Sequence, residues 1–206
     1  MSVLVPTTVL DLTQDPPKVV RQGAGPGMGL MLDVSFSQRT EGYLRLARRL
    51  EPLGLYWLEL DLRDPEALAL VRGGTRTPIA SLESLHGVHE YRPYIAARAV
   101  DTVLVDPLWN GVYQSVRVAS LADAFDTHVA PHNPVGELGN LMSAHFCAAV
   151  ANARIMELRP DEAPWSRSFV TAPAPVIDGE LHIPAGPGWG AEVDVEALRA
   201  HPPRAV

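Results

Sequence analysis

The stretch LYWLELDL, Leu55 to Leu62, places two carboxylates, Glu59 and Asp61, at the end of an otherwise apolar run. The run has the length and hydrophobicity of a buried β-strand. A carboxylate beside hydrophobic packing is costly unless a cation or hydrogen-bond donors meet it. The stretch therefore predicts a strand that ends at a polar site where the acids have a partner.

Short apolar runs alternate with helical patterns along the chain, and this alternation predicts parallel βα units. Strands are expected over residues 29–34, 55–60, 77–83, 101–106, 126–131 and 153–158. Apolar residues recur at helical spacing over residues 40–53, 64–74, 89–99, 113–125 and 138–151. A Pro- and Gly-rich tail with a short helix follows the last strand, and no second domain is expected.

One ionisable residue ends each expected strand. These residues are Asp33, Glu59, Glu83, Asp106, His132 and Glu157. Consecutive residues of this set are separated in the sequence by about the length of one βα unit. Because the active site of a (β/α)8 barrel is assembled from the carboxyl ends of its strands, the pattern predicts an α/β fold with a barrel-like site.

The first three of these residues, Asp33, Glu59 and Glu83, belong to three successive strands. Hard oxygen ligands without Cys or His suit Mg²⁺, which prefers carboxylates and keeps positions open for water or substrate. We therefore expect a Mg²⁺ site. The alternative for each acid is a solvated loop position or an ion pair with an arginine such as Arg63.

Asp106 and His132 end neighbouring strands. An Asp that accepts the Nδ1 proton of a His fixes its tautomer and leaves Nε2 free to take a proton from substrate. The alternative for His132 is an ordinary loop residue. Glu157 could donate a proton or hydrogen bond to an enolate oxygen, or it could pair with Arg154 or Arg159 instead.

Composition restricts the class of protein. The 206 residues carry a net charge of −7 with a pI near 5.4, which argues against a nucleic-acid or anionic-membrane partner. The single cysteine, Cys147, cannot form an internal disulfide, and no apolar run approaches the roughly 18–20 residues of a membrane span. We expect a cytoplasmic protein. Lys18 is the one lysine, so Schiff-base chemistry has no good candidate.

Six motifs occur in an informative order: LMLDVSF, WLELDL, PIASLES, VLVDPLWNGV, VAPHNPVG and IMELR, followed by GELHIPAGPGWGAEVD. Together they resemble the C-terminal barrel domain of the enolase superfamily, mandelate racemase subgroup, over roughly residues 19–203. The resemblance implies a partial (β/α)8 barrel that carries strands three to eight. It divides the chain into an irregular N-terminal segment, residues 1–18, and a barrel domain with a closing tail, residues 19–206.

The resemblance also implies functions for the strand-end residues. Asp33, Glu59 and Glu83 would bind Mg²⁺, His132 with Asp106 would form the base, and Glu157 would be the electrophilic acid. The family's common reaction removes the proton α to a carboxylate and gives an enediolate. A small-molecule carboxylate is therefore the expected ligand, and dehydration of a sugar acid is the expected reaction.

This sequence departs from the family in several places. Asp33-Val34-Ser35 stands where many relatives have Asp-x-Asn, or Asp-x-His in some sugar acid dehydratases, and Glu59-Leu60-Asp61 replaces Glu-Glu-Pro. The family's cap domain, its first two barrel strands and their lysine motif have no counterpart, so two open sheet edges are expected.

Three alternatives stay open. A racemase or epimerase of a 2-hydroxy acid would need a second base on the opposite face. The chain could be an inactive truncated fragment, or could act only by associating with a full-length relative through its open edges. A metal-dependent binding module for acidic sugars is the third. A homo-oligomer stays open as well.

Overall fold

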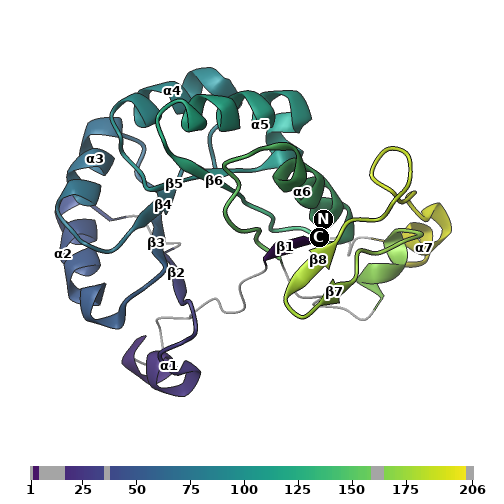
Figure 1. Cartoon of the computed structure of the whole chain (residues 1–206), viewed down its shortest axis with the longest axis horizontal. Helices are drawn as coiled ribbons and strands as arrows, with labels where there is room; N and C mark the ends of the chain where they lie inside the picture. The colour runs from purple at the N-terminus through teal and green to yellow at the C-terminus, as the bar shows by residue number, and fades with distance from the viewer. Residues whose placement is uncertain (1, 5–16, 35–37, 159–164, 203–206) are drawn as a thin grey trace.

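A computed structural model describes residues 2–4, 17–34, 38–158 and 165–202 (Figure 1). Its centre is a five-stranded sheet in the order β2-β3-β4-β5-β6, in which every neighbouring pair is parallel. The strands are β2 (Met31–Val34), β3 (Trp57–Leu60), β4 (Ile79–Ser81), β5 (Thr102–Val105) and β6 (His128–Pro131). The expectation of an α/β fold with part of a barrel is confirmed.

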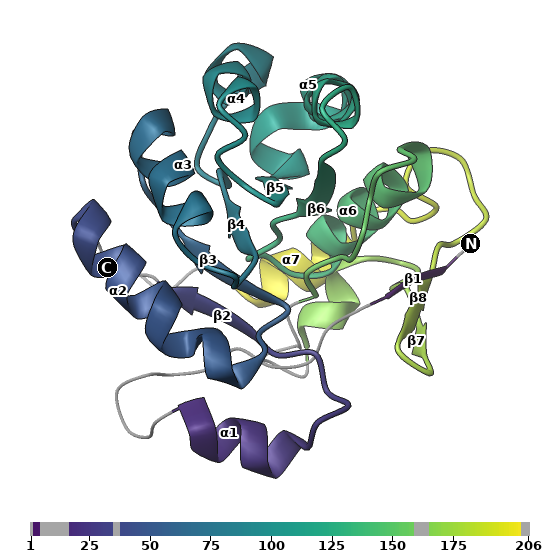
Figure 2. The same ribbon diagram turned by 60° about the vertical axis from the view of Figure 1, so that its left-hand side comes forward.

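One helix follows each strand and covers the outside of the curved sheet (Figures 1 and 2). The helices are α2 (Thr40–Leu50), α3 (Pro65–Gly73), α4 (Gly87–Ala96), α5 (Pro107–Asp123) and α6 (Glu137–Ala149). Leu32, Leu58 and Val103 point to these helices and are fully buried. None of the described helices is long and apolar enough to cross a membrane.

The opposite face of the sheet carries a second, smaller apolar layer. It is formed by Trp57, Ala80, Leu104, Ala130 and Ile155. Leu55, two residues before Trp57, does not share this face. Because β3 begins only at Trp57, the strand pleat does not extend to Leu55, which packs in the helix-side core.

The sixth expected strand, over residues 153–158, is reduced to a single parallel bridge between Val129 and Ala153. Val129 donates to Asn152 O at 3.0 Å and accepts from Arg154 N at 3.0 Å. The next step of this ladder would need an N–H from Pro131, which has none. The segment therefore runs beside β6 without continuing its hydrogen bonds.

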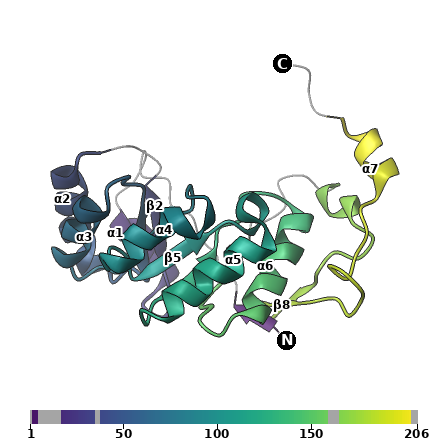
Figure 3. The ribbon, with the colours of Figure 1, turned by 90° about the horizontal axis from the view of Figure 1, so that it is seen from above.

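The ends of the chain form a separate antiparallel sheet in the order β1-β8-β7. Its strands are β1 (Ser2–Leu4), β7 (Val176–Ile177) and β8 (Glu180–His182). The other short elements are α1 (Pro17–Ala24), η1 (Glu51–Leu53), η2 (Ser166–Phe169) and α7 (Val195–Ala200). Residues 1–18 were expected to be irregular, but β1 and the start of α1 lie within them. Seen from above, the C-terminal elements extend past α6, at the end opposite α2 (Figure 3).

Asp101 joins three elements at the amino ends of the strands. Its Oδ1 accepts from Arg72 Nε and Nη2 at 2.9 and 2.8 Å, and its Oδ2 accepts from Ile79 N at 2.9 Å. Ile79 is fully buried, so its N–H depends on this carboxylate. Asp101, the residue before β5, therefore links the start of β5 to α3 and β4.

We expect Asp101→Ala to lower the free energy of unfolding by about 1–3 kcal/mol, because it leaves a buried N–H without an acceptor. Urea denaturation followed by circular dichroism measures the change. The control is Glu196→Ala, which breaks an exposed ion pair with Arg199 and should have little effect. Equal stability of both variants would contradict the assignment.

Candidate active site

The strand pleat explains why polar groups converge at the carboxyl ends of the strands. Side chains two residues apart in a strand share a face, so each site residue follows an inward-facing apolar residue. The pairs are Met31 and Asp33, Trp57 and Glu59, Leu104 and Asp106, Ala130 and His132, and Ile155 and Glu157. The inner apolar layer is thus the floor of the candidate site.

β4 departs from this rule. The pleat would place Leu82 at the mouth, two residues after Ala80, yet Leu82 has φ 92° and is buried in the helix-side core. A bulky residue with positive φ is a true conformational outlier that costs free energy. The reversal turns Leu82 away from the inner face and brings Glu83 to the mouth in its place.

Asp33, Glu59 and Glu83 line one cavity of about 520 Å³. Asp33 and Glu59 are direct partners in the register of β2 and β3. The remaining lining residues are Val34, Gln38, Tyr43, Leu60, Asp61, Leu62 and Arg63. The three acids expected to bind Mg²⁺ therefore face the same space.

The cavity concentrates negative charge. Burial raises the pKa of Glu59 well above its ordinary value, and the hydrogen bond with Glu83 and the charges of Glu83, Asp33 and Glu157 raise it further. The pKa of Asp61 is raised by burial and by the charge of Glu83. Carboxylates in such surroundings are stabilised by a cation.

The three acids fit Mg²⁺ by ligand type and by location, since all are carboxylates on one cavity. Within the described ranges, however, no three Asp, Glu, His or Cys side chains converge closely enough to hold a metal ion. Asp33, Glu59 and Glu83 could hold one only after their carboxylates move toward a common point. Rotation between staggered rotamers of these side chains at the cavity wall would allow such a movement.

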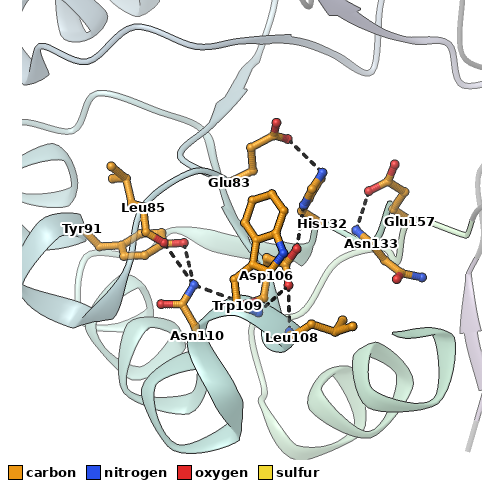
Figure 4. A network of polar contacts seen from close by, with 10 residues as sticks. All are labelled: Glu83, Leu85, Tyr91, Asp106, Leu108, Trp109, Asn110, His132, Asn133 and Glu157. Carbon is orange, nitrogen blue, oxygen red and sulfur yellow. Dashed lines mark hydrogen bonds and ion pairs between the residues drawn. The ribbon is translucent and has the colours of Figure 1, made fainter. Parts of the chain in front are cut away.

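Asp106 is a fully buried carboxylate with three hydrogen-bond partners (Figure 4). Its Oδ1 accepts from the N–H groups of Leu108 and Trp109 at 2.7 and 2.9 Å, which caps the start of α5. Its Oδ2 lies 3.0 Å from His132 Nδ1. The same carboxylate thus begins a helix and orients an imidazole.

His132 lies between two carboxylates. Besides the contact with Asp106, its Nε2 is 3.5 Å from Glu83 Oε2. Burial lowers its pKa, but the hydrogen bond that His132 donates to Asp106 and the charges of Glu83 and Glu157 outweigh burial, so that the pKa is raised. Nε2 was expected to be free for substrate; in this structure it faces Glu83.

Glu157 is exposed and is fixed through Asn133, two residues after the end of β6. Its Oε2 accepts from Asn133 N at 2.6 Å, and the buried Asn133 side chain donates to Asn140 Oδ1 of α6 at 2.6 Å. The alternative ion pair with Arg154 is not formed, because Arg154 lies over the Tyr56 ring at 4.5 Å. Arg159 lies outside the described residues.

Several residues of the site were not expected from the sequence. Gln38, Tyr43 and Arg63 line the cavity, and Trp109 packs against His132 with ring centroids 5.3 Å apart. Arg63 was considered only as an ion-pair partner for an acid. Trp109 follows Asp106 by three residues, and this spacing within the first turn of a capped helix is the one signal that could have indicated it.

A family model described as enolase C-terminal domain-like matches residues 9–198. The chain belongs to this family. Its sequence is similar to D-xylonate dehydratase from Haloferax volcanii, 30% identical over 188 residues that cover 89% of this chain and 45% of the relative. It is also similar to D-gluconate dehydratase from Thermoproteus tenax, 28% identical over 190 residues, 89% of this chain and 38% of the relative.

Solved structures agree with the family. A mandelate racemase/muconate lactonizing enzyme-like protein from Rubrobacter xylanophilus superposes with a TM-score of 0.85 at 35% identity, covering 91% of this chain and 48% of that one. A second solved structure is that of a Burkholderia xenovorans protein, described as a candidate L-alanine-DL-glutamate epimerase and bound to magnesium and fumarate. It superposes with a TM-score of 0.88 at 44% identity, covering 91% of this chain and 47% of that one. The enolase-like chain spans about half the length of the proteins it matches.

Replacing Leu82 tests whether the backbone reversal before Glu83 is strained. Gly is normally less stable than Ala within a strand, but at positive φ the order reverses, so we expect Leu82→Gly to be about 1 kcal/mol more stable than Leu82→Ala. Chemical denaturation of both variants measures the difference.

The matched control is Leu32, which is fully buried in β2. There, Leu32→Gly should be less stable than Leu32→Ala. If the Gly variant is less stable than the Ala variant at both positions, no strain is stored at Leu82.

Proposed function

We propose that the site removes the proton α to a carboxylate from a small organic acid, and that the reaction is the dehydration of a sugar acid. The observation that carries the proposal is the His132 imidazole, held by the buried Asp106 at 3.0 Å beside a cavity lined by acids. An oriented imidazole next to an open cavity is the arrangement of a general base. The names of the sugar acid dehydratases among the relatives support the same reaction.

Each residue of the site has a defined role in this reaction. Asp106 accepts from His132 Nδ1, so Nε2 is the atom that takes the substrate proton once it is released from Glu83. Glu157, anchored by Asn133 N, is placed to donate a hydrogen bond to the enolate oxygen when it is protonated. His132 could then return its proton to the departing β-hydroxide.

We propose Mg²⁺ as the cofactor, with Asp33, Glu59 and Glu83 as its ligands. The mutual repulsion of these acids and the magnesium in the Burkholderia xenovorans structure support this choice. A bound Mg²⁺ offsets the negative charge that develops on the substrate carboxylate.

We propose a location in the cytoplasm. The single Cys147, which cannot form an internal disulfide, is consistent with it.

Epimerisation is the second candidate, favoured by the 44% identical Burkholderia xenovorans neighbour. It needs a base on each face of the substrate. The described lining of the cavity contains Arg63 but no lysine or histidine that could serve as the second base. Dehydration by one base therefore agrees better with this site.

Exchange of the α-proton with solvent tests the base. We expect the chain with Mg²⁺ in D₂O to exchange the α-proton of D-gluconate or D-xylonate, and His132→Asn to slow exchange by about 10²–10⁴-fold. Proton NMR follows the exchange, and a 2-keto-3-deoxy product distinguishes dehydration from epimerisation. His128→Asn is the control, because His128 is exposed at the other end of the same strand. Unchanged exchange in His132→Asn would refute the assignment.

Thermal unfolding tests the metal site and the alternative of an inactive fragment. With Mg²⁺ at a hundred times its Kd, the parent should gain about 2.7 kcal/mol of stability, whereas Glu59→Gln should gain little. Without Mg²⁺, Glu59→Gln should be more stable than the parent, because it removes a buried charge among like charges.

The control for this measurement is Glu180→Gln, at an exposed position on β8. It should behave as the parent does in both conditions. If Mg²⁺ does not raise the melting temperature of the parent, the ligand assignment is contradicted and the alternative of an inactive fragment is favoured.

A further inference from the structure

Trp109 exposes a large aromatic surface directly beside the candidate base. Its side chain is 49% exposed, although its ring contacts His132 with centroids 5.3 Å apart and planes inclined by 57°. Figure 4 shows the indole rising from α5 next to the imidazole. Exposed aromatic surface next to polar catalytic groups is typical of a ligand contact.

The backbone that carries Trp109 is fixed. Pro107 to Asn110 form a single helical turn, which ends where Gly111 adopts φ 69° and ψ 159°. Asp106 accepts from the backbone N–H of Trp109 at 2.9 Å, so one carboxylate orients the base and fixes the backbone that carries the indole. A rigid element of this kind can define the shape of a site.

Asn110 fixes the other side of the turn. Its Nδ2 donates to Leu85 O at 3.1 Å, and its Oδ1 accepts from Gly87 N at 2.7 Å. The turn is therefore tied to the loop before α4 as well as to β5.

Besides His132, one further aromatic ring lies against the indole. The imidazole of His86 stacks on it at 6.2 Å with planes inclined by 15°. Among the described residues, none accepts a hydrogen bond from the indole N–H. The indole thus offers both exposed apolar surface and an N–H donor beside the His132 ring.

We propose that Trp109 determines the substrate chain length, by packing on the C–H face of the carbons beyond the reacting α-carbon of a polyhydroxy acid. The indole N–H donates to one of the hydroxyl groups. This inference rests on the proposed function, since it takes His132 to mark the α-carbon. An acid of three carbons leaves the indole without a contact, whereas one of five or six carbons covers it.

Equilibrium binding of a long and a short acid tests the inference without requiring turnover. Isothermal titration calorimetry with Mg²⁺ compares D-gluconate with D-glycerate, which share the carboxylate and the α-hydroxyl. We expect Trp109→Ala to weaken D-gluconate binding about tenfold, the loss of one aromatic contact. D-glycerate binding should be unchanged, and Trp109→Phe, which keeps an aromatic face but not the N–H, should lie between parent and Trp109→Ala.

Trp165→Ala is the matched control. Trp165 is 44% exposed and stacks on His201 at 4.5 Å, within the C-terminal elements. It should leave both affinities unchanged. Equal weakening of the two acids by Trp109→Ala, no weakening of either, or no binding of D-gluconate by the parent would each overturn the inference.

Exchange of the α-proton on the same samples separates this inference from the proposed function. Binding of D-gluconate that depends on Trp109 but gives no exchange would contradict the function and leave the role of Trp109 standing. If Trp109→Ala changes neither the exchange rate nor the affinity for D-gluconate, the role of Trp109 is overturned and the proposed function stands.

Discussion

The buried carboxylate of Asp106 is the group on which the site depends. A carboxylate without solvent contact is tolerated only when hydrogen-bond donors replace water, and here two backbone N–H groups of α5 and the His132 ring do so. One side chain therefore fixes the start of a helix, the direction of an imidazole on the next strand and the backbone of Trp109. Loss of this group would disturb packing and chemistry together.

The alternation of the strands places the other groups. An apolar residue that points inward is followed, two positions later, by an acid or an imidazole at the mouth, as for Trp57 and Glu59. β4 reaches the same result by another route, since the conformation of Leu82 brings Glu83 to the cavity. The regular fold supplies most of the site, and one irregular residue completes it.

Sequence spacing predicted the parallel units, the strand-end residues and the neighbourhood of Asp106 and His132, because these follow from local periodicity. It could not predict the loss of the sixth strand, which depends on Pro131 lying where β6 would donate to the next segment. For Trp109 the only signal in the sequence is its place three residues after Asp106, because the contact of its ring with His132 depends on the kink at Gly111 and on tertiary packing. The roles of the site residues stay predictions.

The pairing of β1 with β8 has a consequence for how the chain folds. Ser2 lies opposite His182 in this sheet, so β1 cannot pair with β8 until the five βα units between them have been synthesised. The βα units, by contrast, join segments close in sequence and can form as they emerge from the ribosome. The antiparallel sheet should therefore assemble after the βα units, and β1 stays without its partner strand while they form.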